Sequence, residues 1–163
     1  MEKVNEILYA TDLSATAKEA MSWTKSLADK YDAKITIVHI IPDLVEEINT
    51  FGTNRSFGTD RSKPSIGQER DDAIASKQEE ILQLCKERLK DQPDCKIDLD
   101  HILVKVGKPV QEILKTVDSG KFDILIMGTH SKGLLSKVLL GSVAKGVVEQ
   151  CSVPVLTVRL SSD

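Results

Sequence analysis

Apolar residues along the chain occur in two arrangements that alternate. Short, dense apolar runs are typical of strands buried on both faces of a parallel sheet. Between them, apolar residues recur every three or four positions, as on one face of an amphipathic helix. The segment from Ile97 to Leu103 instead alternates apolar and polar residues, which predicts a strand whose beginning is half exposed. The dense runs predict four further strands, at residues 4–10, 33–41, 122–127 and 153–158.

Helical periodicity fills the intervals between these strands. One helix is expected from Ser14, as its N-cap, to Tyr31, and another around residues 74–89. A third is expected to open at Pro109 and to stop at Gly120, and a fourth to lie around residues 143–148. Five strands alternating with four helices predict an α/β fold, a three-layer sandwich around a five-stranded parallel sheet, with residues 1–163 in one domain.

Composition narrows the class of protein. Charged residues make up 29% and aromatic residues 4% of the chain, which is typical of a globular protein with an aliphatic core. A net charge of -3 argues against nucleic-acid binding, and no apolar run approaches the roughly 20 residues that cross a membrane. The N-terminus lacks the pattern of a secretory signal. Three widely spaced cysteines favour a reducing compartment, so a cytoplasmic protein is expected.

Residues 46–68 carry little apolar periodicity. A patternless stretch of this length in a compact domain is either a mobile surface loop or a ligand lid. The sequence favours the mobile loop. If the segment is a lid, its basic residues Arg55, Arg61 and Lys63 would suit an anionic ligand.

The residues directly after the strands carry the candidate chemistry, because ligands of open parallel sheets bind beyond the carboxyl ends of the strands. Asp12 follows the first strand and Gly128 the fourth. Gly141 and Ser142 then open a helix whose amide groups and positive dipole end would bind a phosphate. A Ser142 that only caps its helix, and an Asp12 that only caps the helix that starts near Ser14, explain the same pattern.

Histidines and nucleophiles give little support for catalysis. His39 ends the second strand and is interpreted as a packed or hydrogen-bonded core histidine. The three histidines share no metal-ligand spacing, and no nucleophile–base pair is visible.

Two stretches of the chain resemble the universal stress protein family. They are ILYATDLSATAKEAMSWTKSLADKYDAKITIVHII, from Ile7, and IMGTHSKGLLSKVLLGSVAKGVVEQCSVPVLTVR, from Ile126. Nucleotide-binding members of that family carry G-x2-G-x9-G-[ST] after the fourth strand. Here the pattern reads Gly128, Ser131 at the second glycine, Gly141 and Ser142.

The resemblance implies a Rossmann-like, adenine nucleotide-binding α-hydrolase-like fold that holds ATP or ADP above the first and fourth strands. Mg²⁺ or Mn²⁺ would accompany the triphosphate, with no metal ligand assigned among the protein side chains. Four implied positions lie beside the base: Ala10, Thr11, Asp12 and Ile40. Four more lie under the ribose and phosphates, Met127, Gly128, His130 and Ser131, and four at the helix N-terminus, Gly141, Ser142, Val143 and Ala144.

The last strand predicts a partner. Val153–Val158 is apolar and contains Pro154, which suits the edge of a sheet. A second copy would cover that edge, and many family members dimerise in this way. The expected function is nucleotide-dependent signalling or protection under stress, by a homodimer with slow or absent ATP hydrolysis. The alternative is a dimeric interaction module of the same family that binds no nucleotide; a slow ATPase is less favoured.

Overall fold

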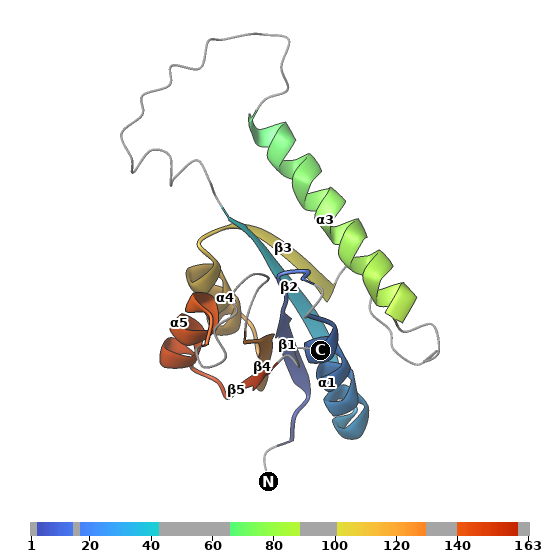
Figure 1. Cartoon of the computed structure of the whole chain (residues 1–163), viewed down its shortest axis with the longest axis vertical. Helices are drawn as coiled ribbons and strands as arrows, with labels where there is room; N and C mark the ends of the chain where they lie inside the picture. The colour runs from blue at the N-terminus through green and yellow to red at the C-terminus, as the bar shows by residue number, and fades with distance from the viewer. Residues whose placement is uncertain (1–2, 15–16, 43–65, 89–100, 130–139, 160–163) are drawn as a thin grey trace.

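Strands and helices alternate along the chain in the predicted order (Figure 1). The computed structural model describes residues 3–14, 17–42, 66–88, 101–129 and 140–159. In chain order the elements are β1 (Glu6–Ala10), α1 (Ala17–Tyr31), β2 (Lys34–Pro42), α3 (Ile66–Arg88), β3 (Ile102–Gly107), α4 (Pro109–Ser119), β4 (Ile124–Gly128), α5 (Ser142–Gln150) and β5 (Val155–Val158).

The strands form one five-stranded sheet in the order β3-β2-β1-β4-β5, and every pair is parallel. The predicted α/β fold class is therefore confirmed. The chain first builds outward from β1 to β2 and β3, then returns to the other side of β1 for β4 and β5. This reversal places β1 and β4 side by side at the centre of the sheet, and it leaves β5 at an edge, as Pro154 just before it predicts.

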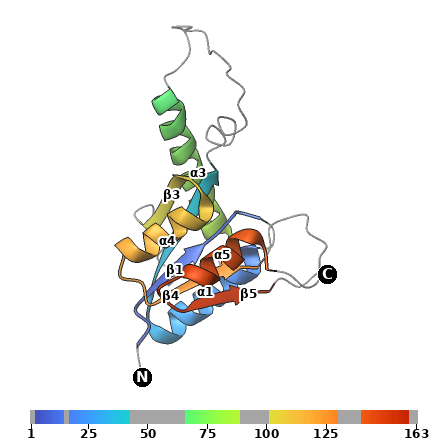
Figure 2. The ribbon, with the colours of Figure 1, turned by 90° about the vertical axis from the view of Figure 1, so that its left-hand side faces the viewer.

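Helices cover both faces of the sheet, so the core has two halves (Figures 1 and 2). On one face, Ile7, Ile37 and Ile126 pack with buried residues of α1 and α3. On the other face, Leu8 and Leu125 pack with buried residues of α4 and α5. Consecutive residues of β1 and β4 thus point into opposite apolar layers. This arrangement explains why those strands read as unbroken apolar runs in the sequence.

Several element boundaries differ from the sequence prediction. The third strand was expected to begin at Ile97, but β3 begins at Ile102, and residues 97–100 lie outside the described residues. Ile102 falls among the polar positions of the predicted alternation, yet it is 1% exposed because α3 covers it. The described part of the first helix begins at Ala17, whose amide bonds to the Ser14 carbonyl, and residues 15 and 16, between this helix and its predicted N-cap, lie outside the described residues. Residues 66–68, placed in the predicted loop, begin α3, while residues 46–65 lie outside the described residues.

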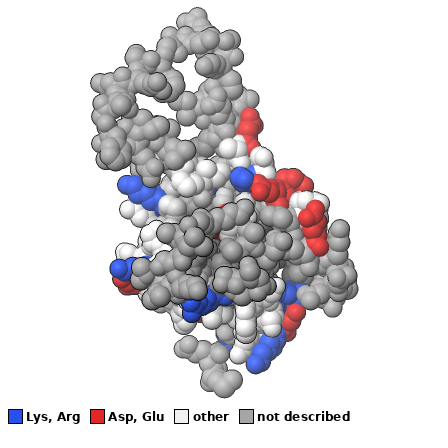
Figure 3. Space-filling model, viewed as in Figure 1, with Lys and Arg blue, Asp and Glu red and all other residues white. Residues whose placement is uncertain are grey.

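The α3 helix lies against the outer strand of the sheet. Its Gln78 Nε2 donates to the Ile102 carbonyl at 3.0 Å, which occupies an outward-facing acceptor of β3. The first half of α3 extends past the end of the sheet (Figures 1 and 2), and acidic side chains gather along this helix (Figure 3). None of the described helices is both long and apolar enough to cross a bilayer.

Candidate functional site

A cavity of about 310 Å³ lies at the carboxyl ends of β1 and β4, where the strand order reverses. The α1 helix, which follows β1, and the α5 helix, which follows β4, pack on opposite faces of the sheet, and the cavity lies between the ends of the two strands. Its volume falls at the lower end of the range for small-molecule sites. The α4 and α5 helices form the opposite wall of the cavity.

The cavity brings together ten of the twelve predicted nucleotide-binding positions, although they come from β1, β2, β4 and α5. The other two, His130 and Ser131, lie outside the described residues, as do the lysines at 132 and 137 and the basic residues of the predicted lid. The ten that line the cavity are Ala10, Thr11, Asp12, Ile40, Met127, Gly128, Gly141, Ser142, Val143 and Ala144.

Side-chain hydrogen bonds shape the β1–α1 loop, residues 11–14, at the rim of the cavity. The Thr11 hydroxyl accepts from the Leu13 amide at 3.1 Å, and Asp12 Oδ1 accepts from the Ser14 amide at 2.9 Å. Leu13 between them has a φ of 61°, a conformation that non-glycine residues adopt only when their surroundings require it. The Asp12 carboxylate therefore organises this loop.

His39 ties the second strand to the same loop. It is 9% exposed and borders the cavity, and its Nδ1 lies 2.8 Å from the Thr11 carbonyl oxygen. Because a carbonyl oxygen only accepts hydrogen bonds, Nδ1 must carry the proton and donate. The interpretation of His39 as a hydrogen-bonded core histidine agrees with this geometry.

The first turn of α5 faces the cavity. Gly141 is the N-cap, and no side chain caps the helix there. The Gly141 amide donates to the Thr129 carbonyl at 2.8 Å, and the Gly141 carbonyl accepts from Lys145 at 2.9 Å. The amides of the first three helical residues have no intrahelical acceptor by helix geometry. These residues, Ser142, Val143 and Ala144, all line the cavity.

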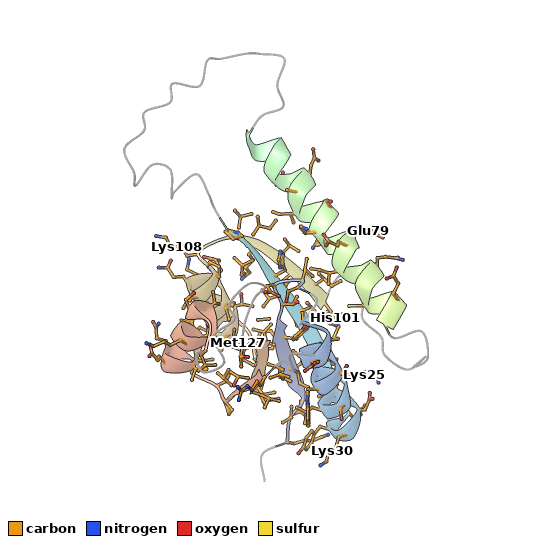
Figure 4. The ribbon with its side chains drawn as sticks, viewed as in Figure 1. Lys25, Lys30, Glu79, His101, Lys108 and Met127 are labelled. Carbon is orange, nitrogen blue, oxygen red and sulfur yellow. The ribbon has the colours of Figure 1, made fainter. Side chains whose placement is uncertain are left out.

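Apart from the polar groups of the β1–α1 loop and of His39, much of the cavity lining outside α5 is apolar. Figure 4 shows Met127 between the strands and the α4–α5 layer, where it is 5% exposed. Sequence reasoning missed the contribution of α4, whose Pro109 and Ile113 line the cavity. A signal was available, because a helix opened by a proline directly after a strand begins at the carboxyl edge of the sheet. The remaining lining residues that were not predicted are Tyr9, Ser14, Ala17, Val38, His39, Pro42 and Thr129.

Charge in the cavity is sparse. Among the described lining residues, Asp12 is the one acidic side chain, and there is no lysine or arginine. Positive potential on this part of the wall therefore comes from the backbone amides and dipole of α5. Within the described ranges, no three His, Cys, Asp or Glu side chains are grouped so that they could hold a metal ion.

Comparisons with known proteins agree with this architecture. The profile of the universal stress protein family matches residues 3–51 and 57–159. Universal stress protein MJ0577 of Methanocaldococcus jannaschii is 29% identical over 156 residues, which cover 94% of each chain. A universal stress protein of Thermus aquaticus is 28% identical over 156 residues, covering 94% of this chain and 97% of that one.

Solved structures give the same result. The structure of MJ0577 superposes with a TM-score of 0.72 at 26% identity and covers 99% of this chain and all of that chain. A universal stress protein in complex with cAMP has a TM-score of 0.59 at 21% identity, covering 98% of this chain and all of that chain. The second likeness concerns the fold alone. Because the family profile spans nearly the whole sequence, this chain belongs to the universal stress protein family.

Proposed function

We propose that this universal stress protein binds an adenine nucleotide, ATP or ADP, in the cavity between β1 and β4. The observation that carries the proposal is the pairing of an apolar wall with the N-terminus of a nine-residue helix in one cavity. An apolar wall suits a flat base, and a helix N-terminus suits phosphate. The two ends of a nucleotide thus find different, matching surroundings.

The base fits the part of the cavity between β2 and α4. Ile40 and Pro42 on one side and Pro109 and Ile113 on the other present apolar surface to a ring. Asp12 at the rim offers a carboxylate that can accept a hydrogen bond from an amino group on the base. This combination favours a base that carries an exocyclic donor, as adenine does.

The phosphates fit the α5 end of the cavity. Amides of Ser142, Val143 and Ala144 can donate to phosphate oxygens, and the Ser142 hydroxyl adds a further donor. The described lining contributes no cationic side chain, so a triphosphate there calls for a counterion. Mg²⁺ or Mn²⁺ bound by the phosphates themselves would supply that charge.

The biological role proposed is nucleotide-dependent signalling or protection under stress, by a homodimer formed along β5. One structural relative is described as a complex with cAMP, but its 21% identity makes it evidence of the fold alone. The dimer is supported by the position of β5 at the sheet edge and by its half-buried apolar residues Val155 and Leu156.

Equilibrium dialysis with labelled ATP and Mg²⁺ tests the nucleotide proposal, with ADP, AMP and adenosine as competitors. Affinity should fall along that series, because each lost phosphate removes contacts to the α5 N-terminus. Mass spectrometry of small molecules that stay bound through purification gives an independent check. If the chain retains no adenine nucleotide, it is instead the nucleotide-free interaction module; if adenosine binds as tightly as ATP, the phosphate end is misplaced.

A further inference from the structure

The β1–α1 loop borders two cavities. One is the large cavity described above, and the other, of about 30 Å³, lies toward α1 and α3 and is lined in part by Leu13, Met21 and Ile81. Thr11 and Ser14 line both. Leu13 packs against the core between the sheet and α1 and α3, but the rest of the loop has open space on both sides. Its hydrogen bonds therefore contribute much of what fixes its conformation.

Among the described residues, five hydrogen bonds hold this loop, and two of them tie it to β2. The Thr11 amide donates to the Val38 carbonyl at 3.0 Å, which continues the sheet pattern by one residue. His39 Nδ1 donates to the Thr11 carbonyl at 2.8 Å. Two more, from the Leu13 and Ser14 amides to the side chains of Thr11 and Asp12, lie within the loop, and a fifth, from the Ala17 amide to the Ser14 carbonyl, joins it to α1. Among these five bonds, His39 is the only side chain that comes from outside the loop.

We propose that His39 is a positioning residue for the nucleotide site. By holding the Thr11 carbonyl, it fixes the loop in the conformation that sets Asp12 at the rim of the cavity. The inference rests on the proposed function, because it assigns His39 a part in nucleotide binding. It differs from a purely structural role in one respect: what matters is a donor at the Nδ1 position, not the volume or polarity of the ring.

Two amide substitutions distinguish the nitrogens of the ring. In His39→Asn the side-chain nitrogen sits one bond beyond Cγ, as Nδ1 does, so it can still donate to Thr11. In His39→Gln the nitrogen sits one bond farther out, near the Nε2 position. His39→Leu removes both ring nitrogens and keeps much of the volume. The matched control is Asp123→Asn, which removes a hydrogen-bonded carboxylate at the opposite end of the sheet.

The first measurement is amide hydrogen exchange by NMR in the nucleotide-free protein. The Leu13 and Ser14 amides should exchange about tenfold faster in His39→Leu and His39→Gln, and close to the wild-type rate in His39→Asn. The control should leave both rates unchanged. If His39→Leu does not fold, the exchange rates of His39→Asn and His39→Gln still show whether a donor at the Nδ1 position is required. Wild-type exchange in His39→Gln, or equal exchange in the Asn and Gln variants, overturns the proposal.

The second measurement is the affinity for ATP with Mg²⁺. It should fall by about tenfold in His39→Gln and His39→Leu and by less than about threefold in His39→Asn. A tight-binding Gln variant beside a weak-binding Asn variant would show that Nε2 is the functional atom and overturn the proposal. Failure of the wild-type protein to bind ATP overturns the proposed function instead, and the exchange rates then report on the loop independently.

Discussion

Asp123 joins the beginnings of two strands that are far apart in sequence. Its Oδ2 accepts hydrogen bonds from the amides of Asn5, at 2.7 Å, and Glu6, at 2.9 Å, while its own amide donates to the Glu6 carbonyl. The amide of Asn5, and then that of Glu6, holds the pKa of the Asp123 carboxyl below its ordinary value of 3.8. One exposed side chain thus closes the amino end of the β1–β4 pair.

Replacing this carboxylate should destabilise the protein in a pH-dependent way. Asp123→Asn keeps an acceptor but loses the charge, so we expect a loss of about 1 kcal/mol in the free energy of unfolding at neutral pH, modest because the site is exposed. Because the folded pKa is depressed, the contribution is complete above the unfolded pKa near 3.8 and disappears as pH falls through the lower folded pKa. Urea unfolding of both proteins across this range measures it; a difference independent of pH would contradict the account.

At the residue scale, the sequence predicted where side chains gather but not how they bond. Ten of the predicted positions line one cavity because the carboxyl ends of parallel strands meet at one edge, which pattern alone indicates. The bond from His39 to Thr11 and the bonds from Asp123 to β1 depend on strand register and side-chain rotamers. Neither is encoded in a local pattern, since the partners lie 28 and 118 residues apart.

The end of α4 shows how one element is stopped. Gly120 is its C-cap, and the Gly120 amide bonds to the carbonyls of Thr116 and Val117. A Cβ at this glycine would lie 2.2 Å from the ring of Phe122, so the chain can turn tightly here only without a side chain. Gly120 was correctly predicted as the stop, but the close approach of Phe122 was not, because it depends on packing across the turn.

Gly120→Ala should therefore lower the free energy of unfolding by about 2 kcal/mol, because Phe122 must move out of its place against the α4–α5 core. The control is Gly146→Ala inside α5, where the nearest atom, Val110 Cγ2, would be 3.1 Å away. Alanine is favoured over glycine in a helix by about 1 kcal/mol, which offsets much of that tighter contact. Thermal unfolding of the two variants compares them. Equal losses would contradict the explanation.

The N-terminus of α5 allows stability and binding to be separated. Ser142→Asp places a negative charge at the first helical position, where it should stabilise the helix dipole by about 0.5 kcal/mol. The same charge should repel a bound phosphate and weaken ATP binding by about tenfold. Ser142→Asn, which is polar but neutral, is the control. Denaturation without nucleotide measures the free energy of unfolding, and dialysis with ATP and Mg²⁺ measures the affinity for ATP. A more stable Asp variant with unchanged ATP affinity would place the phosphates elsewhere.

At the scale of the whole molecule, alternating patterns were sufficient for the fold class because each buried strand and amphipathic helix is a local signal. The boundaries of β3 were not predicted, since α3 buries Ile102, a position that the local alternation assigns to the polar side. The contribution of α4 to the cavity was also missed. The proline that opens α4 directly after β3 signals that the helix begins at this edge of the sheet, but which of its side chains reach the cavity depends on how α4 packs beside α5.

The proposed homodimer can be tested with one substitution on β5. The Leu125 amide bonds to the Pro154 carbonyl and the Thr129 amide to the Val158 carbonyl, so Val155 and Thr157 direct their backbone groups to the open edge. Thr157→Pro removes an outward amide and leaves the pairing with β4 intact. Because a two-fold interface uses each contact twice, the dimer should weaken by about tenfold or more, as measured by sedimentation over a range of concentrations.

The control is Val106→Pro on the opposite edge, where the Ile102 carbonyl already faces outward to Gln78. A dimer that both variants leave unchanged uses another surface, and a monomeric wild-type protein contradicts the dimer altogether.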